Sequence, residues 1–256
     1  MPSRFAKQFI FGSTYLAVVF VVVYGFYFAR LKPAPSCFDN RRNQGEEEKD
    51  CGGPCELCAI RSLTPLAASA PSVFNPGNRT TTVSFSVRNE NLDYGALTFS
   101  YTIHFSDKSG RELFATTKEA FVYPASVKHI VEFDVPFDPA RIAASTVTIG
   151  DGTRWQIAEL FSVPQLEARN IQVYTDTARE QAVVTGEFVN NSAFAVRRAT
   201  ASVVITNDLG LPVGASKTTV RDLEGNGNRA FQVVVPGIVE EKIDERFIGL
   251  YLEGER

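Results

Sequence analysis

The sequence predicts a mainly-β protein, in which a single transmembrane helix is followed by two tandem immunoglobulin-like antiparallel β-sandwiches. Three observations support this fold class. Residues 8–29 form an uncharged, mostly apolar run. Segments after residue 71 alternate apolar and polar side chains, as half-buried strands do. The pattern of these strands then repeats once, at a spacing of about 100 residues.

The apolar run extends from Gln8 to Ala29. A helix that rises about 1.5 Å per residue spans the roughly 30 Å hydrocarbon core of a bilayer over this length. A cleaved signal peptide is the alternative, but its apolar region usually covers about 7 to 15 residues and ends in a small-x-small site. Neither feature is present here. We therefore expect an uncleaved anchor over 8–29, preceded by a cytoplasmic stub over 1–7.

Basic residues flank both ends of the run, so charge alone does not orient the helix. All four cysteines lie between Cys37 and Cys58, and none follows. Clustered cysteines are typical of an oxidising compartment, where disulfides persist. The sequence therefore predicts a single-pass protein of the cell membrane, with a cytoplasmic amino terminus and the bulk of the chain extracytoplasmic.

A Cys-rich juxtamembrane module is expected over residues 33–60. Its cysteines are Cys37, Cys51, Cys55 and Cys58. So short a segment, with few large apolar side chains, cannot bury a core and needs cross-links. Two disulfides would supply them, at about 2 to 4 kcal/mol each. A zinc ion held by four thiolates and a redox pair at Cys55 and Cys58 are the alternatives. The D-C-G-G-P-C-x-x-C pattern resembles a short module that recurs in bacterial and archaeal surface proteins beside membrane anchors or between domains.

Oxygen-bearing side chains lie between these cysteines. Asp39, Asn43, Glu46 and Asp50 offer the carboxylate and amide oxygens that calcium prefers. Folding of the loop by disulfides could bring them together. We therefore treat these four residues as candidate calcium ligands, although the spacing is not that of an EF-hand, and we expect no other cofactor.

The β-sandwiches are expected over residues 71–163 and 165–254. In "ALTFSYTIHF" the apolar positions run from Leu97 to Phe105 in steps of two, which predicts a strand with one buried face. "STVTIGDGTRWQIA" predicts a β-hairpin around a Gly-Asp-Gly turn. The two halves match at a strand-ending asparagine, at a turn aspartate and at a turn glycine. The matching pairs are Asn89 with Asn190, Asp107 with Asp208, and Gly110 with Gly210.

This order of features resembles the FxLYD family: a strand ending in Asn89, a long alternating strand, an Asp-x-x-Gly turn at Asp107, and a late strand ending at Pro136. The resemblance implies small immunoglobulin-like domains of bacterial envelope proteins. It covers most of each half.

Acidic residues outnumber basic ones, 29 to 26, which disfavours nucleic-acid binding because that requires a basic face. The two histidines, His104 and His129, are expected to be surface residues, and no catalytic motif is recognisable. We therefore expect a protein that is not an enzyme, with a binding or scaffolding role at the cell envelope. Its expected partners are the membrane and other envelope or surface proteins. The alternative is a structural subunit of a multiprotein envelope assembly, such as a secretion or pilus machine.

Overall fold

The computed structural model describes residues 4–28, 36–76, 80–238 and 245–256. The chain divides into two compact units, residues 1–62 and residues 63–256. Each unit is described separately below. The predicted fold class is confirmed, because one apolar helix is followed by four antiparallel sheets that form sandwich-like domains.

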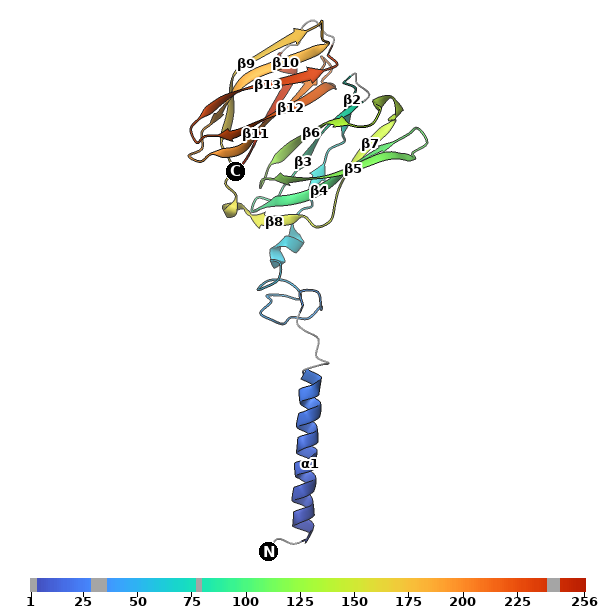
Figure 1. The fold of residues 1–256 in the computed structure, drawn as a ribbon, viewed down its shortest axis with the longest axis vertical. Helices are drawn as coiled ribbons and strands as arrows, with labels where there is room; N and C mark the ends of the chain where they lie inside the picture. The colour runs from blue at the N-terminus through green and yellow to red at the C-terminus, as the bar shows by residue number, and fades with distance from the viewer. Residues whose placement is uncertain (1–3, 29–35, 77–79, 239–244) are drawn as a thin grey trace. The chain divides into compact units, whose positions relative to one another are not determined.

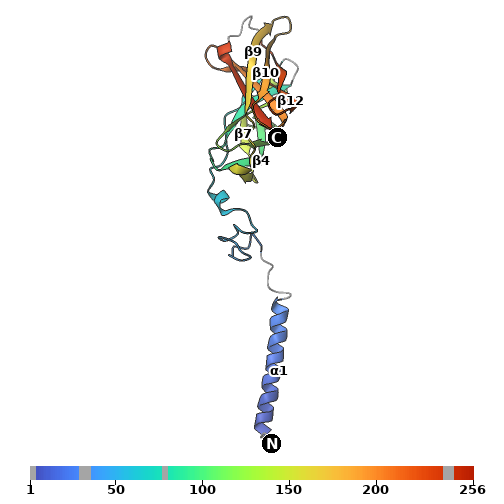
Figure 2. The same cartoon turned by 90° about the vertical axis from the view of Figure 1, so that its left-hand side faces the viewer.

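The first unit begins with helix α1, Arg4–Phe26, which is unbroken in both views of the molecule (Figures 1 and 2). It has 23 residues, and none of them is buried. Its mean hydropathy of 2.1 and its length suit either a membrane anchor or a signal sequence near the amino terminus. Ala29, the last residue of the predicted span, and residues 1–3 of the predicted stub lie outside the described residues.

The Cys-rich module consists of turns, and it ends in a short 3-10 helix, η2, Cys58–Ser62. A single β-bridge joins Glu48 to Cys51. The guanidinium of Arg61 closes the module by donating hydrogen bonds to the backbone carbonyls of Lys49 and Asp50, both at 2.8 Å. Residues 33–35 of the predicted module lie outside the described residues.

The second unit contains both sandwiches. In the first, one sheet comprises β1 (Ala67–Ala68), β2 (Ser72–Phe74), β3 (Thr81–Arg88) and β6 (Val127–Val135). The facing sheet comprises β4 (Tyr94–Ser106), β5 (Glu112–Val122), β7 (Ala144–Ile149) and β8 (Arg154–Ile157). Two 3-10 turns, η3 (Pro139–Arg141) and η4 (Ala158–Leu160), lie outside the sheets.

The second sandwich has three strands in each sheet. One sheet has the order β13-β10-β9, with β9 (Leu166–Asp176), β10 (Gln181–Asn190) and β13 (Asn228–Pro236). The other has the order β12-β11-β14, with β11 (Val196–Thr206), β12 (Pro212–Leu223) and β14 (Ile248–Glu255). A 3-10 turn, η5 (Glu245–Phe247), leads into β14.

The apolar residues at alternate positions of β4 fill the core of the first sandwich. Phe99, Tyr101, Ile103 and Phe105 are all at most 2% exposed. Leu97 was expected to continue this buried row, but it is 40% exposed. The pairing of β4 with both of its neighbours shifts register between residues 96 and 99, and such a bulge turns the side chains that precede it.

The hairpin predicted around the Gly-Asp-Gly turn is wrong. Both β7 and β8 pair antiparallel with β4, β7 along residues 101–106 and β8 along residues 94–98. The two strands therefore run in the same direction, and the turn is an interruption between them. Gly152, with a φ of +86°, supplies the left-handed conformation that the interruption requires.

The repeated asparagines do the same work in the two sandwiches. Asn89 and Asn190 are 2% and 0% exposed. The amide of Asn89 donates to the carbonyls of Tyr94 and Tyr123, at 2.7 and 3.0 Å. That of Asn190 donates to the carbonyl of Phe194, at 2.9 Å, and also to two carbonyls at the end of β12. Each asparagine thus ties the end of its strand to two other segments.

Candidate functional site: the cleft between the sandwiches

The two sandwiches meet where the outer face of the β12-β11-β14 sheet lies against β6 and its neighbours (Figure 1). Alternate residues of β11 point to opposite faces, so the side chains not used in the second core face the first sandwich. Phe74, Val131, Ala215 and Val204 form a small apolar cluster there.

Contacts of aromatic rings continue the interface between the two sandwiches. The ring of His129 on β6 stacks on that of Tyr251 on β14, with centroids 3.4 Å apart and planes inclined by 8°. Burial lowers the pKa of His129 below its ordinary value. The Tyr123 hydroxyl donates to the carbonyl of Gly254 at 2.7 Å. His129 was predicted to be a surface residue, and it is half-buried, because the second sandwich covers one face of its ring.

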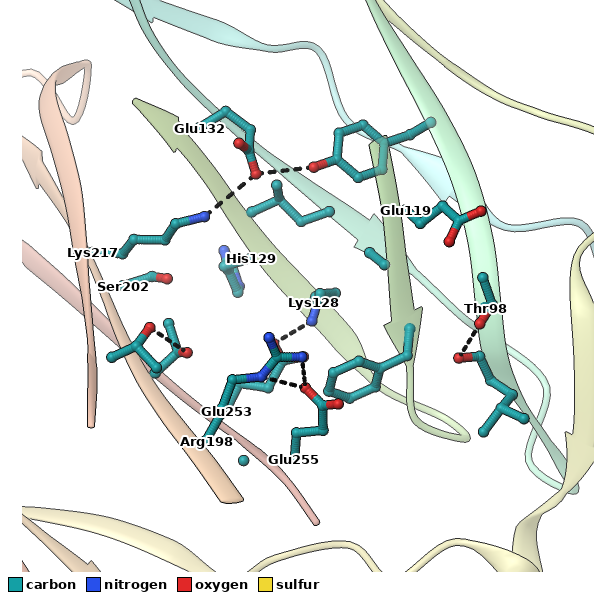
Figure 3. Close-up of a pocket in the computed structure, with 18 residues that line it drawn as sticks. Thr98, Glu119, Lys128, His129, Glu132, Arg198, Ser202, Lys217, Glu253 and Glu255 are labelled. Carbon is teal, nitrogen blue, oxygen red and sulfur yellow. Dashed lines mark hydrogen bonds and ion pairs between the residues drawn. The ribbon is translucent and has the colours of Figure 1, made fainter. Parts of the chain in front are cut away.

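An open cleft of about 380 Å³ lies beside these contacts, between β4, β5 and β6 on one side and β11, β12 and β14 on the other (Figure 3). Its lining is mostly polar. The lining residues with ionisable or hydroxyl side chains are Thr98, Tyr101, Glu119, Lys128, His129, Glu132, Arg198, Thr200, Ser202, Lys217, Thr219, Glu253 and Glu255.

Glu132 is the centre of a charged cluster at one end of the cleft, and the residue is 8% exposed. It accepts a hydrogen bond from the Tyr101 hydroxyl at 3.0 Å, lies 3.3 Å from the Lys217 ammonium and contacts the Lys118 ammonium. Burial alone would raise its pKa, but the two lysines and the hydroxyl together lower the pKa of Glu132 below its ordinary value. Lys217 comes from the second sandwich, so this cluster bridges the two.

The second bridge is the ion pair between Lys128 on β6 and Glu253 on β14, whose side chains are 10% and 28% exposed. Burial lowers the pKa of Lys128 and raises that of Glu253, despite their mutual attraction. The Lys128 ammonium also lies 3.9 Å from the ring centroid of Phe121. Desolvation therefore opposes the charged form of both partners, and their mutual attraction offsets part of this cost.

The wall opposite β6 carries polar groups that are less tightly engaged. The Thr200 and Thr219 hydroxyls lie 3.0 Å apart, and Arg198 pairs with Glu255. Ser202, 4% exposed, lies between Lys217 and Tyr251 on the same face of the sheet. Within the described residues its hydroxyl makes no hydrogen bond, and it is directed into the cleft (Figure 3).

Sequence reasoning missed this cleft, although one signal for it exists. Lys128 and Glu132 alternate with the core residue Ile130 on the inner face of β6. Charged side chains at such positions are almost never buried without a partner. The pattern "VKHIVEF" could therefore have indicated two buried ion pairs. The partners from the second sandwich, Lys217 and Glu253, lie more than 80 residues further along the chain and could not have been identified from this pattern.

In the Cys-rich module, the four predicted cysteines form two disulfides. Cys37 is bonded to Cys55 and Cys51 to Cys58, with Cα–Cα distances of 5.6 and 4.9 Å. Cys55 and Cys58 are therefore not partners of one another. No thiolate remains for a zinc site in this state of the protein, because every cysteine belongs to a disulfide.

Three of the candidate calcium ligands, the carboxylates, accept hydrogen bonds from the protein's own donors, whereas Oδ1 of Asn43 is buried without a partner in the described part of the chain. The Asp50 carboxylate accepts the N–H groups of Asp39 and Asn40 at 2.8 to 2.9 Å, and the Asn43 amide donates to Asp39 at 2.8 Å. This last bond is the main reason why the pKa of Asp39 is lowered. Glu46 accepts the N–H of Asn43 at 3.0 Å. Each carboxylate thus holds the turns of the loop.

Two groups of potential metal ligands gather in the described part of this module, Cys37 with Glu46 and Cys55, and Glu48 with Cys51 and Cys58. Their sulfur atoms all belong to disulfides, which are poor ligands, since a metal prefers the thiolate. Neither group unites Asp39, Glu46 and Asp50. Calcium binding by the predicted set stays a prediction.

His104 lies outside the cleft, on the solvent-facing side of β4. Its Nδ1 is 2.6 Å from the Glu112 carboxylate and its Nε2 is 3.0 Å from the Thr148 hydroxyl. The order of carboxylate, imidazole and hydroxyl resembles a nucleophile with its base. The Glu112 side chain is 59% exposed, and none of the three residues lines the inter-sandwich cleft.

The fold and the cleft define a class of protein, namely tandem β-sandwich-like domains joined into one unit behind an apolar helix and a disulfide-bonded module. No protein-family model matches the chain, and no curated protein matches its sequence. Among solved structures, the crystal structure of red sea bream transglutaminase is similar at a TM-score of 0.26 and 11% identity. The match covers 77% of this chain but only 32% of the transglutaminase chain.

Proposed function

We propose that this chain is a membrane-anchored extracytoplasmic protein with a non-catalytic binding or scaffolding role at the cell envelope. The observation that carries the proposal is the order of its first unit, in which an apolar helix of 23 residues precedes a module with two disulfides. A helix of this length suits a bilayer, and disulfides persist outside the cytoplasm. The amino terminus is then cytoplasmic and residues 33–256 lie outside.

The contact between the sandwiches supports a scaffolding role. The Lys128–Glu253 pair, the Glu132 cluster and the His129–Tyr251 stack join strands of different sandwiches. Linked domains move relative to one another unless their interface holds them. These contacts favour a rigid two-sandwich body that presents its loops in a fixed arrangement.

We also propose that the sandwiches are FxLYD-like domains. The buried Asn89 and Asn190, which the resemblance places at the end of an early strand, make corresponding hydrogen bonds in the two halves. A shared internal contact of this kind supports a common domain type for the two halves.

The alternative is a structural subunit of a multiprotein envelope assembly, such as a secretion or pilus machine. One observation favours it. The turn between β11 and β12 exposes Leu209 and Leu211, which are 77% and 58% exposed. Two exposed leucines separated by one residue offer an apolar surface on which another protein could bind.

Membrane fractionation tests the leading proposal. We expect the chain to resist alkaline carbonate extraction, to retain its first 32 residues by intact mass, and to expose its carboxyl-terminal sandwich to protease on the outer side. Its cysteines should react with a maleimide only after reduction. A soluble mature chain that lacks the helix, or free cysteines in cells, would contradict the proposal. Co-purification of a stoichiometric partner in mild detergent would favour the assembly subunit over the lone binder.

A further inference from the structure

We propose that the cleft between the sandwiches is a binding site for a neutral glycan chain, held through hydroxyl groups. The inference rests on the proposed extracytoplasmic binding function, and it adds the ligand class. At about 380 Å³, the cleft has the size of a small-molecule site, for which about 300 to 1,000 Å³ is usual.

Two polar groups in the cleft lack partners. The Ser202 hydroxyl is in a residue only 4% exposed and makes no hydrogen bond within the described part of the chain. The same holds for both ring nitrogens of His129, which offers only its ring face to Tyr251. Neither is among the fully buried side-chain atoms that lack a partner, so both groups are open to the cleft, where they can bind water or a ligand.

The unpartnered groups select a ligand that both donates and accepts. A serine hydroxyl does both, and a neutral imidazole has one nitrogen of each kind. Burial keeps His129 neutral by lowering its pKa. The hydroxyl groups of a sugar have this dual character, whereas a carboxylate or phosphate only accepts.

The charges of the cleft argue against an ionic ligand. Each of its cations already faces a carboxylate: Lys128 faces Glu253, Lys217 faces Glu132 and Arg198 faces Glu255. An anion would have to compete with these pairs, and a cation would meet lysines on both walls. A neutral ligand leaves every pair intact.

The two unpartnered groups come from different sandwiches. His129 lies on β6 of the first sandwich and Ser202 on β11 of the second, and both line the cleft. A ligand that contacts both would therefore bind only while the sandwiches stay together.

The test uses the full chain in phosphatidylcholine nanodiscs, because many common detergents carry sugar headgroups. Maltotriose, cellobiose and N,N′-diacetylchitobiose are titrated as neutral probes and a heparin disaccharide as the anionic probe, with saturation-transfer NMR as the readout. We expect at least one neutral sugar to bind. Ser202→Ala removes the hydroxyl, and His129→Phe keeps a ring on Tyr251 but removes both nitrogens. Each should weaken that binding about tenfold, since 1.4 kcal/mol corresponds to a factor of ten.

Matched controls are Ser109→Ala and His104→Phe, which make the same chemical changes away from the cleft. Both should bind as the parent does. Failure of all three neutral sugars, binding of the heparin disaccharide alone, or binding that neither cleft variant weakens would overturn the proposal. A folded His129→Phe protein keeps the test decisive if Ser202→Ala loses stability.

A second arm identifies the source of the glycan. Nanodiscs that contain digalactosyl diglyceride should show saturation transfer to its headgroup if the glycan belongs to a lipid, whereas binding of soluble sugars alone indicates a free polysaccharide. Either result supports the neutral-glycan site. Membrane fractionation decides the proposed function without any sugar, so the two proposals can fail separately.

Discussion

The Cys-rich module and the cleft between the sandwiches solve the same problem, the joining of distant segments, in different ways. The module has little apolar surface to bury, and its turns are held by two disulfides and by carboxylates that accept backbone N–H groups. The cleft lies between two complete cores, and it is bridged by ion pairs and stacked rings. The comparison teaches that covalent cross-links replace a core where the chain is too short to form one.

Removal of the Cys37–Cys55 disulfide should have the largest effect on the module. This bond closes a separation of 18 residues and the other one of 7, so Cys37→Ser with Cys55→Ser should cost about 1 kcal/mol more than Cys51→Ser with Cys58→Ser. Hydrogen exchange of the full chain should show fast exchange across residues 37–58. Protection of the sandwiches should not change, and its loss would contradict the separation into two units.

Replacement of Lys128 by methionine should be the most damaging single change in the cleft. It leaves the partly buried Glu253 carboxylate without its partner, and we expect a loss of about 2 to 4 kcal/mol in the free energy of unfolding, measured in urea. The exposed Lys108→Met is the matched control and should change stability by less than about 0.5 kcal/mol. Equal losses in the two variants would remove the argument for a structural ion pair.

Glu132 should make stability depend on pH. Its folded-state pKa is lowered, so its contribution is fully present above its ordinary value of 4.5 and is lost as the pH falls through the lowered pKa. The stability difference between the parent and Glu132→Gln should therefore be constant near neutral pH and shrink below about pH 4.5. Urea titrations across this range measure it. Glu119→Gln, in the same cleft but unpaired, should follow the parent curve throughout.

The contribution of Glu253 to stability changes with pH in the opposite direction. Its pKa is raised by burial, so its contribution is present below its ordinary value of 4.5 and is lost as the pH rises through the raised pKa. Both variants of the previous test retain Glu253, and the comparison between them therefore isolates Glu132.

The smallest effect is expected at the surface hydrogen-bond chain. Thr148→Val removes a hydroxyl from an exposed position and should change unfolding free energy by less than about 0.5 kcal/mol. It should also leave any sugar binding intact, because Thr148 lies outside the cleft. Labelling of Thr148 by a fluorophosphonate probe in the parent, abolished by His104→Ala, would instead identify a reactive hydroxyl.

Local patterns predicted what is local. The period of two in β4 identified the row of residues that fills the first core, and the repeat identified Asn89 and Asn190 before their hydrogen bonds were known. The Gly-Asp-Gly turn led to a wrong prediction of a hairpin. The sequence of a turn does not show whether the two strands that flank it pair with each other or both pair with a third strand, as β7 and β8 do with β4. The pairing of Cys37 with Cys55 was open, since four cysteines allow three connectivities.

The cleft could not be predicted, because it is formed by strands that lie far apart in the sequence. His129 and Tyr251 stack because the outer face of one sandwich meets β6 of the other, and neither strand pattern encodes that meeting. What the sequence does contain is the conflict at Lys128 and Glu132, two charges on an otherwise apolar strand face. Such a conflict indicates that a partner exists without naming it.

The Lys128–Glu253 pair can form only late in the folding of the chain. Glu253 lies on β14, which follows every other strand in the chain, while Lys128 belongs to the first sandwich. Domains usually fold as they leave the ribosome, the amino-terminal one first. The first sandwich must therefore complete its core with the lysine still hydrated, and it exchanges that water for a carboxylate only when translation is nearly finished. The two sandwiches therefore dock late, and a truncated chain without β14 cannot complete this docking.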